Sequence, residues 1–403
     1  MKRIFTIPFL VLAFATSAIA DVGKLQGFLN AGKHGDAIAY FADPSTDEAR
    51  FSRSVAQLLA AVERTSQGFY RYGIHASFAD DIPILRLPVP VNPHPEPATN
   101  EHIRNVIARF HLDLHEIETS LGALEGNDFQ LPLDVTSIRI DFNGDGTLDD
   151  DDWMHTLFSV YRPDLNQQMR SGKPLLIDFD LGDAYWLQGY TQILLGISDL
   201  LLAHDTNPVF EAIGHALFRD VDTAMGRVLG EPGVANERRW RSYDKFADLI
   251  AAVHAVSLDV TEPDRLKNAR LHFINMSSSS RTMWKAILAE TDDRNEWLPS
   301  PKQSSVTQVP ITSEMVDSWE LFLREYEGIL DGRILIPHWR FDGKGINLRK
   351  VFEEPSPLDL VQWIQGRGAL PYLEYGPLSD RNNWDRILRG FQGQFFGMAF
   401  WIN

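Results

Sequence analysis

Six aspartates lie within the twelve residues 141–152, and no lysine or arginine is among them. Carboxylates in one short turn repel one another unless a cation neutralises them. Oxygen-bearing side chains stand at positions 1, 3 and 5 of the segment, and a glycine stands at position 6, where a sharp turn requires it. Hard oxygen ligands in this number favour calcium over a transition metal. The sequence therefore predicts one calcium ion in this loop.

The segment resembles the calcium-binding loop of the EF-hand family, and more closely the dockerin-type version, whose last ligand is an aspartate. The resemblance covers only about residues 140–153, and the second loop that both families normally have is not found. The preceding segment also alternates like a strand instead of following a helical period. The resemblance implies a bound Ca2+ ion with ligands from Asp141, Asn143, Asp145, Thr147 (its backbone carbonyl), Asp149 and Asp152.

Two roles are open for a single ion of this kind. It can be structural and hold the preceding strand to the following helix, which is the expectation for an exported protein that meets steady calcium. The alternative is a regulatory ion or one that bridges to a ligand.

A second group consists of His111, His115 and Glu118, which share one face of a predicted helix. Two imidazoles one turn apart with a carboxylate nearby can hold zinc or iron. The stretch His115-Glu116-Ile117-Glu118 also resembles the His-x-x-Glu motif of imelysin-like proteins, which are exported helical proteins linked to iron uptake. That resemblance implies an iron- or zinc-handling protein, whereas a polar pair at the edge of the core is the simpler interpretation.

Asp178, Asp180 and Asp183 form a third group, followed by two aromatic residues. Sugar-cleaving enzymes need one carboxylic acid and one base or nucleophile at a set separation. Asp183 is equally well placed to cap the helix that follows. These residues predict either a hydrolytic site or a helix start.

His204, Glu211 and His215 form a fourth group around Pro208. Glu211 and His215 are one helical turn apart, and a chain reversal could bring His204 close to them. The alternative is that such residues satisfy helix ends. No Gly-x-Ser-x-Gly elbow, His-Glu-x-x-His motif, phosphate loop or dinucleotide fingerprint occurs, which argues against the common hydrolases, metalloproteases and nucleotide enzymes.

The N-terminal segment and the overall charge predict the location of the protein and the partners that it avoids. Residues 1–20 have the positive start, short apolar core and Ala18-Ile19-Ala20 ending of a signal peptide, so we expect cleavage before Asp21 and a periplasmic or secreted protein with no membrane span in the mature chain. An uncleaved anchor is the alternative. The formal net charge of −17 argues against nucleic acid as a partner. The chain has no cysteine, so a large apolar core must take the place of disulfides.

Helical periodicity dominates the sequence and predicts a mainly α, multi-helix globular body with a few short strands. The clearest helix runs from Asp183 to about His204, a second starts with Asn100 as its cap, and 135–140 alternates as a short strand. The predicted organisation is a signal peptide (1–20), an N-terminal helical region (21–86), a Pro-rich linker (87–99), a helical core with the calcium loop (100–300) and a C-terminal α+β region packed on the core (301–403).

From these observations we expect an exported calcium-binding protein with a binding or envelope-associated role, and an unidentified protein or glycan as its partner. The alternatives are an exported hydrolase, acting on carbohydrate in one version, and an imelysin-like iron- or zinc-handling protein.

Overall fold

The computed structural model describes residues 15–75, 89–161, 170, 173–229 and 241–403. Within them the chain is mainly helical with a few short strands, and this confirms the predicted fold class. Among these residues, no helix combines the length and hydropathy that crossing a bilayer requires. Residues 1–14 of the predicted signal peptide lie outside the described residues, and the predicted cleavage site falls within α1 (Ala15–Asn30).

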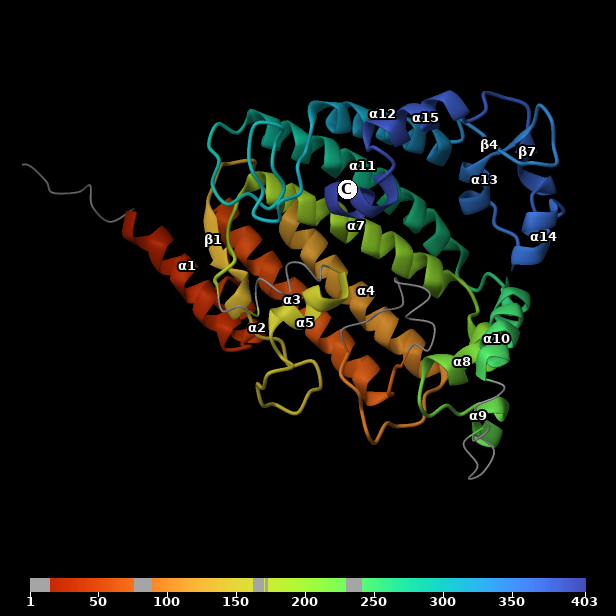
Figure 1. The fold of residues 1–403 in the computed structure, drawn as a ribbon, viewed down its shortest axis with the longest axis horizontal. Helices are drawn as coiled ribbons and strands as arrows, with labels where there is room; N and C mark the ends of the chain where they lie inside the picture. The colour runs from red at the N-terminus through yellow and green to blue at the C-terminus, as the bar shows by residue number, and fades with distance from the viewer. Residues whose placement is uncertain (1–14, 76–88, 162–169, 171–172, 230–240) are drawn as a thin grey trace, which may run out of the picture.

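Two long helices, α7 (Leu181–Ala203) and α11 (Pro263–Ala289), lie side by side through the middle of the molecule (Figure 1). Gly196 of α7 leaves room for the Phe273 ring of α11, because an added Cβ at Gly196 would lie 2.5 Å from that ring. On its other side α7 packs against α4 (Asn100–Gly122), which packs in turn against α3 (Asp47–Arg71). The apolar helix predicted from Asp183 is thus the central core helix.

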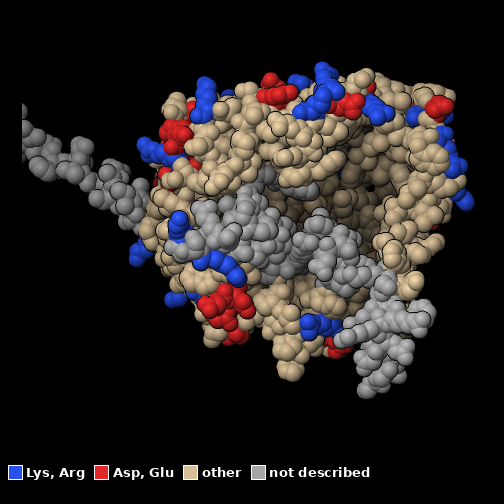
Figure 2. Space-filling view, in the orientation of Figure 1, with Lys and Arg blue, Asp and Glu red and all other residues tan. Residues whose placement is uncertain are grey.

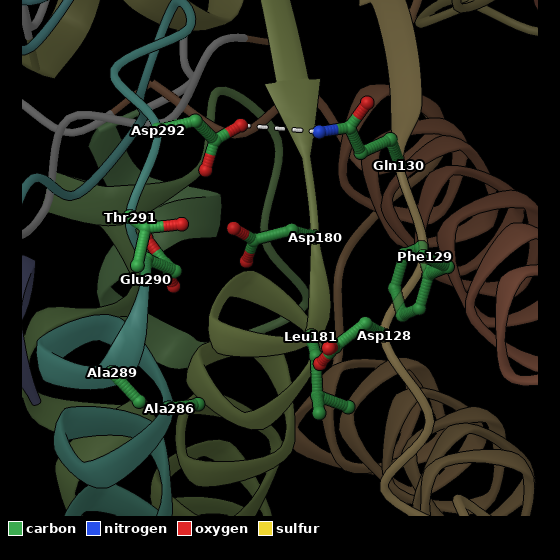
Figure 3. A pocket seen from close by; sticks show the side chains of 10 residues that line it. All are labelled: Asp128, Phe129, Gln130, Asp180, Leu181, Ala286, Ala289, Glu290, Thr291 and Asp292. Atoms are coloured by element: carbon green, nitrogen blue, oxygen red, sulfur yellow. Dashed lines mark hydrogen bonds between the residues drawn. The ribbon is translucent and has the colours of Figure 1, made fainter.

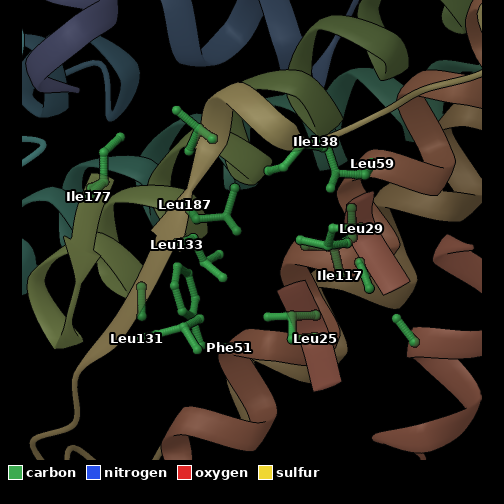
Figure 4. Packing of buried hydrophobic residues seen from close by; sticks show 14 of the residues in the cluster. Leu25, Leu29, Phe51, Leu59, Ile117, Leu131, Leu133, Ile138, Ile177 and Leu187 are labelled. Carbon is green, nitrogen blue, oxygen red and sulfur yellow. The ribbon is translucent and has the colours of Figure 1, made fainter. Parts of the chain in front are cut away.

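The larger hydrophobic core lies between α1, α3, α4, α7 and a short antiparallel pair of strands. Figure 4 shows leucine, isoleucine and phenylalanine side chains from all of these elements meeting in its interior. This core holds the predicted calcium loop in place, because Ile140 and Phe142 at the start of the loop are fully buried in it. The other elements on this side of the molecule are α2 (His34–Tyr40), β1 (Leu131–Asp134), β2 (Leu176–Phe179) and α5 (Met154–Tyr161).

A second core lies on the opposite side of α11 and is rich in aromatic residues. Trp319 of α12, Phe391 and Phe395 pack there with tilted or edge-on rings, and the C-terminal Ile402 is buried beside them. The C-terminus therefore docks firmly on the body. The helices involved are α12 (Ser313–Leu330), α15 (Arg381–Gly390) and α16 (Phe395–Ile402).

Smaller elements complete the described chain around these two cores. A small sheet of order β4-β5-β7 forms around the turn at Asp342-Gly343, and β3 pairs with β6. The bounds are α8 (Asn207–Leu217), α9 (Ala224–Leu229), α10 (Arg241–Ala255), β3 (Ser257–Leu258), β4 (Ile336–Pro337), β5 (Gly345–Ile346), α13 (Leu348–Glu353), β6 (Leu358–Asp359), α14 (Leu360–Gln365) and β7 (Leu373–Glu374).

Two local predictions were wrong. The strand precedes residues 135–140, because the Asp134 carboxylate accepts hydrogen bonds from the Thr136 N–H and hydroxyl and turns the chain into a 3-10 helix. The cap of α4 is Thr99, whose hydroxyl accepts the His102 N–H at 3.2 Å, so that Asn100 is already helical.

Candidate functional site

The predicted calcium loop projects from the body between Ile140 and α5, and its acidic side chains gather at the lower edge of the face shown in Figure 2. Its two ends are tied together. The Ile140 N–H donates to the Asp152 carbonyl at 2.8 Å, and the Met154 N–H donates to the Ile138 carbonyl at 3.0 Å. This tie closes residues 141–152 into one loop.

The first ligand position, Asp141, is oriented by the loop itself. The Gly144 N–H donates to Asp141 Oδ1 at 2.7 Å, and the Gly146 N–H donates to Oδ2 at 3.0 Å. Both glycines have positive φ, +77° and +75°, which permits the tight curl that points their N–H groups inward. From outside the loop, the Gln67 amide donates to the Asp141 carbonyl at 2.8 Å and fixes its backbone.

The next predicted ligands also accept hydrogen bonds from backbone N–H groups two residues further along the chain. Asn143 Oδ1 accepts the Asp145 N–H at 2.9 Å, and Asp145 Oδ1 accepts the Thr147 N–H at 2.7 Å. Asp149 Oδ1 likewise accepts the Asp151 N–H at 2.8 Å. Each side chain thus bends over its own backbone, and the loop keeps the curl that the spacing predicted.

Asp152, the last predicted ligand, is the buried member of the set, with 1% exposure. Its carboxylate accepts the Phe142 N–H at 3.1 Å and the Asp149 N–H at 2.9 Å, so it joins the first and last parts of the loop. Burial raises the pKa of Asp152, and the charges of Asp149 and Asp141 raise it further. A cation in the loop would remove this penalty. The residues present therefore fit calcium, by their oxygen chemistry and by the uncompensated charge that Asp152 buries.

A different group of carboxyl groups comes together at the start of α7. Among the described residues, one group of three acidic or histidine side chains has ligand atoms that all lie within 4.8 Å of one another, and it consists of Asp180, Glu290 and Glu296. The carboxylates of the calcium loop are spaced more widely. Asp180 and Glu290 line a pocket of about 540 Å³, in which they face each other from β2–α7 and from the end of α11 (Figure 3).

The pocket raises the pKa values of its carboxyl groups. Burial is the main cause and the charge of Asp180 adds to it, and together they raise the pKa of Glu290 to about 8 and that of Glu296 to about 7. The pKa of Asp180 is also raised by burial, although backbone N–H groups and a hydrogen bond with Glu290 oppose the rise. At neutral pH the cluster therefore holds protons that ordinary carboxyl groups would have lost.

The three aspartates predicted as a hydrolytic group separate in the structure. Asp180 is the N-cap of α7, and Asp183 Oδ2 accepts the Asp180 N–H at 3.2 Å, so the two form a capping box. Asp183 is thus the third helical residue and does not cap the helix itself. Asp178 lies on β2, where its N–H donates to the Asn295 carbonyl. Of the three, only Asp180 lines the pocket.

The group around Pro208 does not form a shared site. The His204 ring binds the Leu200 carbonyl at 2.8 Å, whereas the His215 ring pairs with Asp248 of α10 at 3.3 Å. Glu211 is exposed on α8. His204 thus satisfies a helix end, as the alternative interpretation predicted, whereas His215 makes a contact between α8 and α10.

The predicted pair on α4 lies in a polar cluster that is mostly buried. His111 Nε2 and His115 Nε2 face each other at 3.1 Å, and Glu118 contacts the other nitrogen of His115 at 2.8 Å. Burial lowers the pKa of His111 to about 4 and also lowers that of His272, which joins the cluster from α11. The imidazoles of His111 and His272 are therefore neutral at pH 7.

Sequence reasoning missed Glu290, Glu296 and His272. Glu290 and Glu296 belong to an acidic run that follows α11, and such a run could have indicated a site. Nothing in the local sequence shows, however, that the run lies next to Asp180. A lone histidine such as His272 in a helix gives no signal of its own.

The chain matches no known protein family, and neither the curated proteins nor the solved structures include a match to it.

Proposed function

We propose that this chain is an exported protein that binds one calcium ion in the loop 141–152, and that the ion has a structural role. The observation that carries the proposal is the burial of Asp152, whose carboxylate joins both halves of an acidic loop that contains no basic residue. The ligands would come from Asp141, Asn143, Asp145, Asp149 and Asp152, with the Thr147 carbonyl.

A calcium ion would neutralise the negative charge of the loop, and apolar side chains of the loop anchor it to the body. Phe142 anchors the start of the loop in the larger core, and Leu148 packs against the turn at Gly32. A closed loop would hold α5 against the β1–β2 side of the body. The N-terminal segment supports export, and an envelope-associated role with a protein or glycan partner follows from export and from the acidic, cysteine-free chain.

The first test is equilibrium dialysis of the purified protein against calcium at physiological ionic strength. We expect one ion per chain, because one loop has the required pattern. Asp141→Ala should abolish this binding, whereas Asp150→Ala, a change of an exposed aspartate in the same loop that is not a predicted ligand, should retain it. Equal binding by wild type and Asp141→Ala would contradict the assignment.

A second candidate function is hydrolysis at the carboxyl pocket. Asp180 and Glu290 share a hydrogen bond and have raised pKa values, so one can act as a general acid while the other acts as a base on water. The pocket, about 540 Å³ in volume, has room for part of a sugar chain or peptide.

A screen of glycoside and peptide substrates tests this second function. Any activity that belongs to the pocket should fall by about 100-fold or more in Asp180→Asn and in Glu290→Gln, since general acid–base groups contribute this much. Asp128→Asn changes a lining residue outside the carboxyl cluster and should keep most of the activity. Activity that survives both cluster variants would exclude this pocket as its site.

A further inference from the structure

A polar cluster with three histidines lies between α4, α7 and α11, away from the calcium loop and the carboxyl pocket. His111 and Asp199 are buried, at 7% and 1% exposure, whereas the side chain of His115 is 44% exposed and opens the cluster to solvent. Its members are His111, His115 and Glu118 of α4, Gln192, Ser198 and Asp199 of α7, and Arg265 and His272 of α11.

The hydrogen bonds around His111 decide which ring nitrogen carries its proton. His111 Nδ1 lies 2.9 Å from the Ser198 hydroxyl, and that hydroxyl already donates its own proton to the Leu195 carbonyl at 2.9 Å. Ser198 must therefore accept a hydrogen bond from His111 Nδ1–H. A neutral imidazole has one N–H, so His111 Nε2 carries a lone pair.

The same reasoning applies to the other two rings. His115 Nδ1 donates to the Glu118 carboxylate at 2.8 Å. Gln192 donates its amide N–H to Glu118 at 2.7 Å, so its oxygen must be the atom that accepts His272 Nδ1–H, also at 2.7 Å. Burial lowers the pKa of His272, so this ring is neutral and also has a bare Nε2 atom, and His115 turns its own Nε2 toward that of His111.

Two of these nitrogens lie near the Asp199 carboxylate, and His115 Nε2 lies beside one of them. His111 Nε2 lies 3.1 Å from His115 Nε2 and 3.5 Å from Asp199 Oδ1, and His272 Nε2 lies 3.8 Å from Asp199 Oδ2. Within the described chain no hydrogen-bond donor reaches Asp199 Oδ2, although the atom is buried. The bare nitrogens of His111 and His272 and the buried Asp199 carboxylate oxygen repel one another unless a cation lies among them.

We propose that His111, His115, His272 and Asp199 form a binding site for one divalent transition-metal ion of the zinc class. Imidazole nitrogens with one carboxylate suit zinc or iron better than calcium. Two nitrogens bound to the same zinc at about 2.0–2.1 Å lie roughly 3.3 Å apart, close to the separation of His111 Nε2 and His115 Nε2. The contacts run from His115 through His111 and Asp199 to His272, and these side chains would close around the ion when it binds.

The hydrogen bonds behind the histidines support a metal more than a chance cluster. Each metal-binding histidine in proteins characteristically donates its second N–H to a carboxylate or other acceptor, which fixes the ring. Ser198, Glu118 and Gln192 do this for the three rings. Glu118, the carboxylate of the His-x-x-Glu stretch, is thus an orienting residue and not a ligand in this arrangement.

Arg265 is the competing cation. Its Nη1 donates to Asp199 Oδ1 at 2.9 Å and to His111 Nε2 at 3.4 Å, and its Nε donates to the exposed Glu262 at 2.7 Å. Arg265 stands at the start of α11 with its side chain 27% exposed, so it can turn outward with Glu262. Metal binding therefore competes with the contact between Arg265 and Asp199.

Zinc titration of the chelator-stripped full chain, in millimolar calcium so that the loop 141–152 is occupied, tests the site. We expect one tight zinc per chain, and a cobalt complex with the visible absorption of a four-coordinate site. His115→Gln and His272→Gln should each weaken zinc by about 100-fold or more. His254→Gln on α10, an exposed histidine, is the matched control and should leave binding unchanged.

The variant Arg265→Gln tests whether the cation at Asp199 is a metal ion or the Arg265 guanidinium. If the site binds metal, this variant should bind zinc at least as tightly as wild type, because a positive charge has been removed. Zinc binding by Arg265→Gln but not by wild type would overturn the proposal, since Arg265 would then be the resident cation. Wild-type affinity in both His115→Gln and His272→Gln, or no binding in any form, would overturn it as well. Circular dichroism of each variant checks that it folds.

Discussion

Removal of calcium should lower the melting temperature of this protein by about 5 °C, and added calcium should restore it. A ligand that binds only the folded state stabilises it by about 2.7 kcal/mol at a hundredfold excess over its dissociation constant. In a domain of roughly 200 residues, each kcal/mol shifts the melting temperature by about 2–4 °C, and the shift is smaller in longer chains. The free energy comes from the acidic loop, where Asp152 is buried against the charges of Asp141 and Asp149.

The variant Asp152→Asn isolates the loop as the source of this effect. It removes one charge, and we expect it to cancel the calcium-dependent rise while leaving the melting temperature in EDTA nearly unchanged. Asp150→Asn removes the same charge from an exposed residue of the loop and should keep the full calcium response. Thermal melts in calcium, in EDTA and in magnesium measure all three forms. A wild-type melting temperature that is equal in calcium and EDTA would contradict a structural ion.

The second large effect should appear as a loss of stability when the pH rises from about 5 to about 8. Glu290 has a pKa of about 8 in the folded protein against 4.5 as its ordinary value, so between these values the folded state binds the proton that the unfolded state has released. Stability falls with rising pH wherever the folded state holds more protons. Glu296, with a pKa of about 7, acts in the same direction.

Glu290→Gln should flatten this pH dependence. The amide keeps an oxygen to accept the Gln303 N–H but cannot ionise, so the variant should exceed wild type at pH 8 by about 1 kcal/mol and match it at pH 4.5. Denaturant unfolding at several pH values gives the comparison. The control is Glu116→Gln on the exposed face of α4, which should follow the wild-type curve. If Glu290→Gln keeps the wild-type slope, the carboxyl group of Glu290 is not the source of the pH dependence.

Much of the fold could be predicted because helices depend on local information. The segment that became α7 is almost free of charge and rich in leucine and isoleucine, so helical periodicity and burial indicated a core helix before any contact was known. The wrong predictions of secondary structure also have local causes. The strand predicted at 135–140 gave way to a turn because the single side chain of Asp134 binds the next N–H groups.

The acidic loop 141–152 is a case in which the sequence carries nearly all the information about the local conformation. Most of its side chains bind backbone groups two to five residues away, as between Asp141 and Gly146 or Asn143 and Asp145, so spacing predicts the curl, and Asp152 alone reaches back ten residues to the Phe142 N–H. Only its anchoring needed the tertiary structure, which buries Phe142 and places Gln67 of α3 on the Asp141 carbonyl.

The two other sites depend on tertiary structure. The sequence by itself determined the helices, the acidic loop and the pairing of His111 with His115, because hydrogen bonds and helical spacing act over a few residues. The packing of α7 against α11 decided that Glu290 meets Asp180 and that His272 meets Asp199. Those contacts join residues far apart in the chain, and what brings them together is the burial of apolar helix faces, which does not depend on the polar residues that become neighbours.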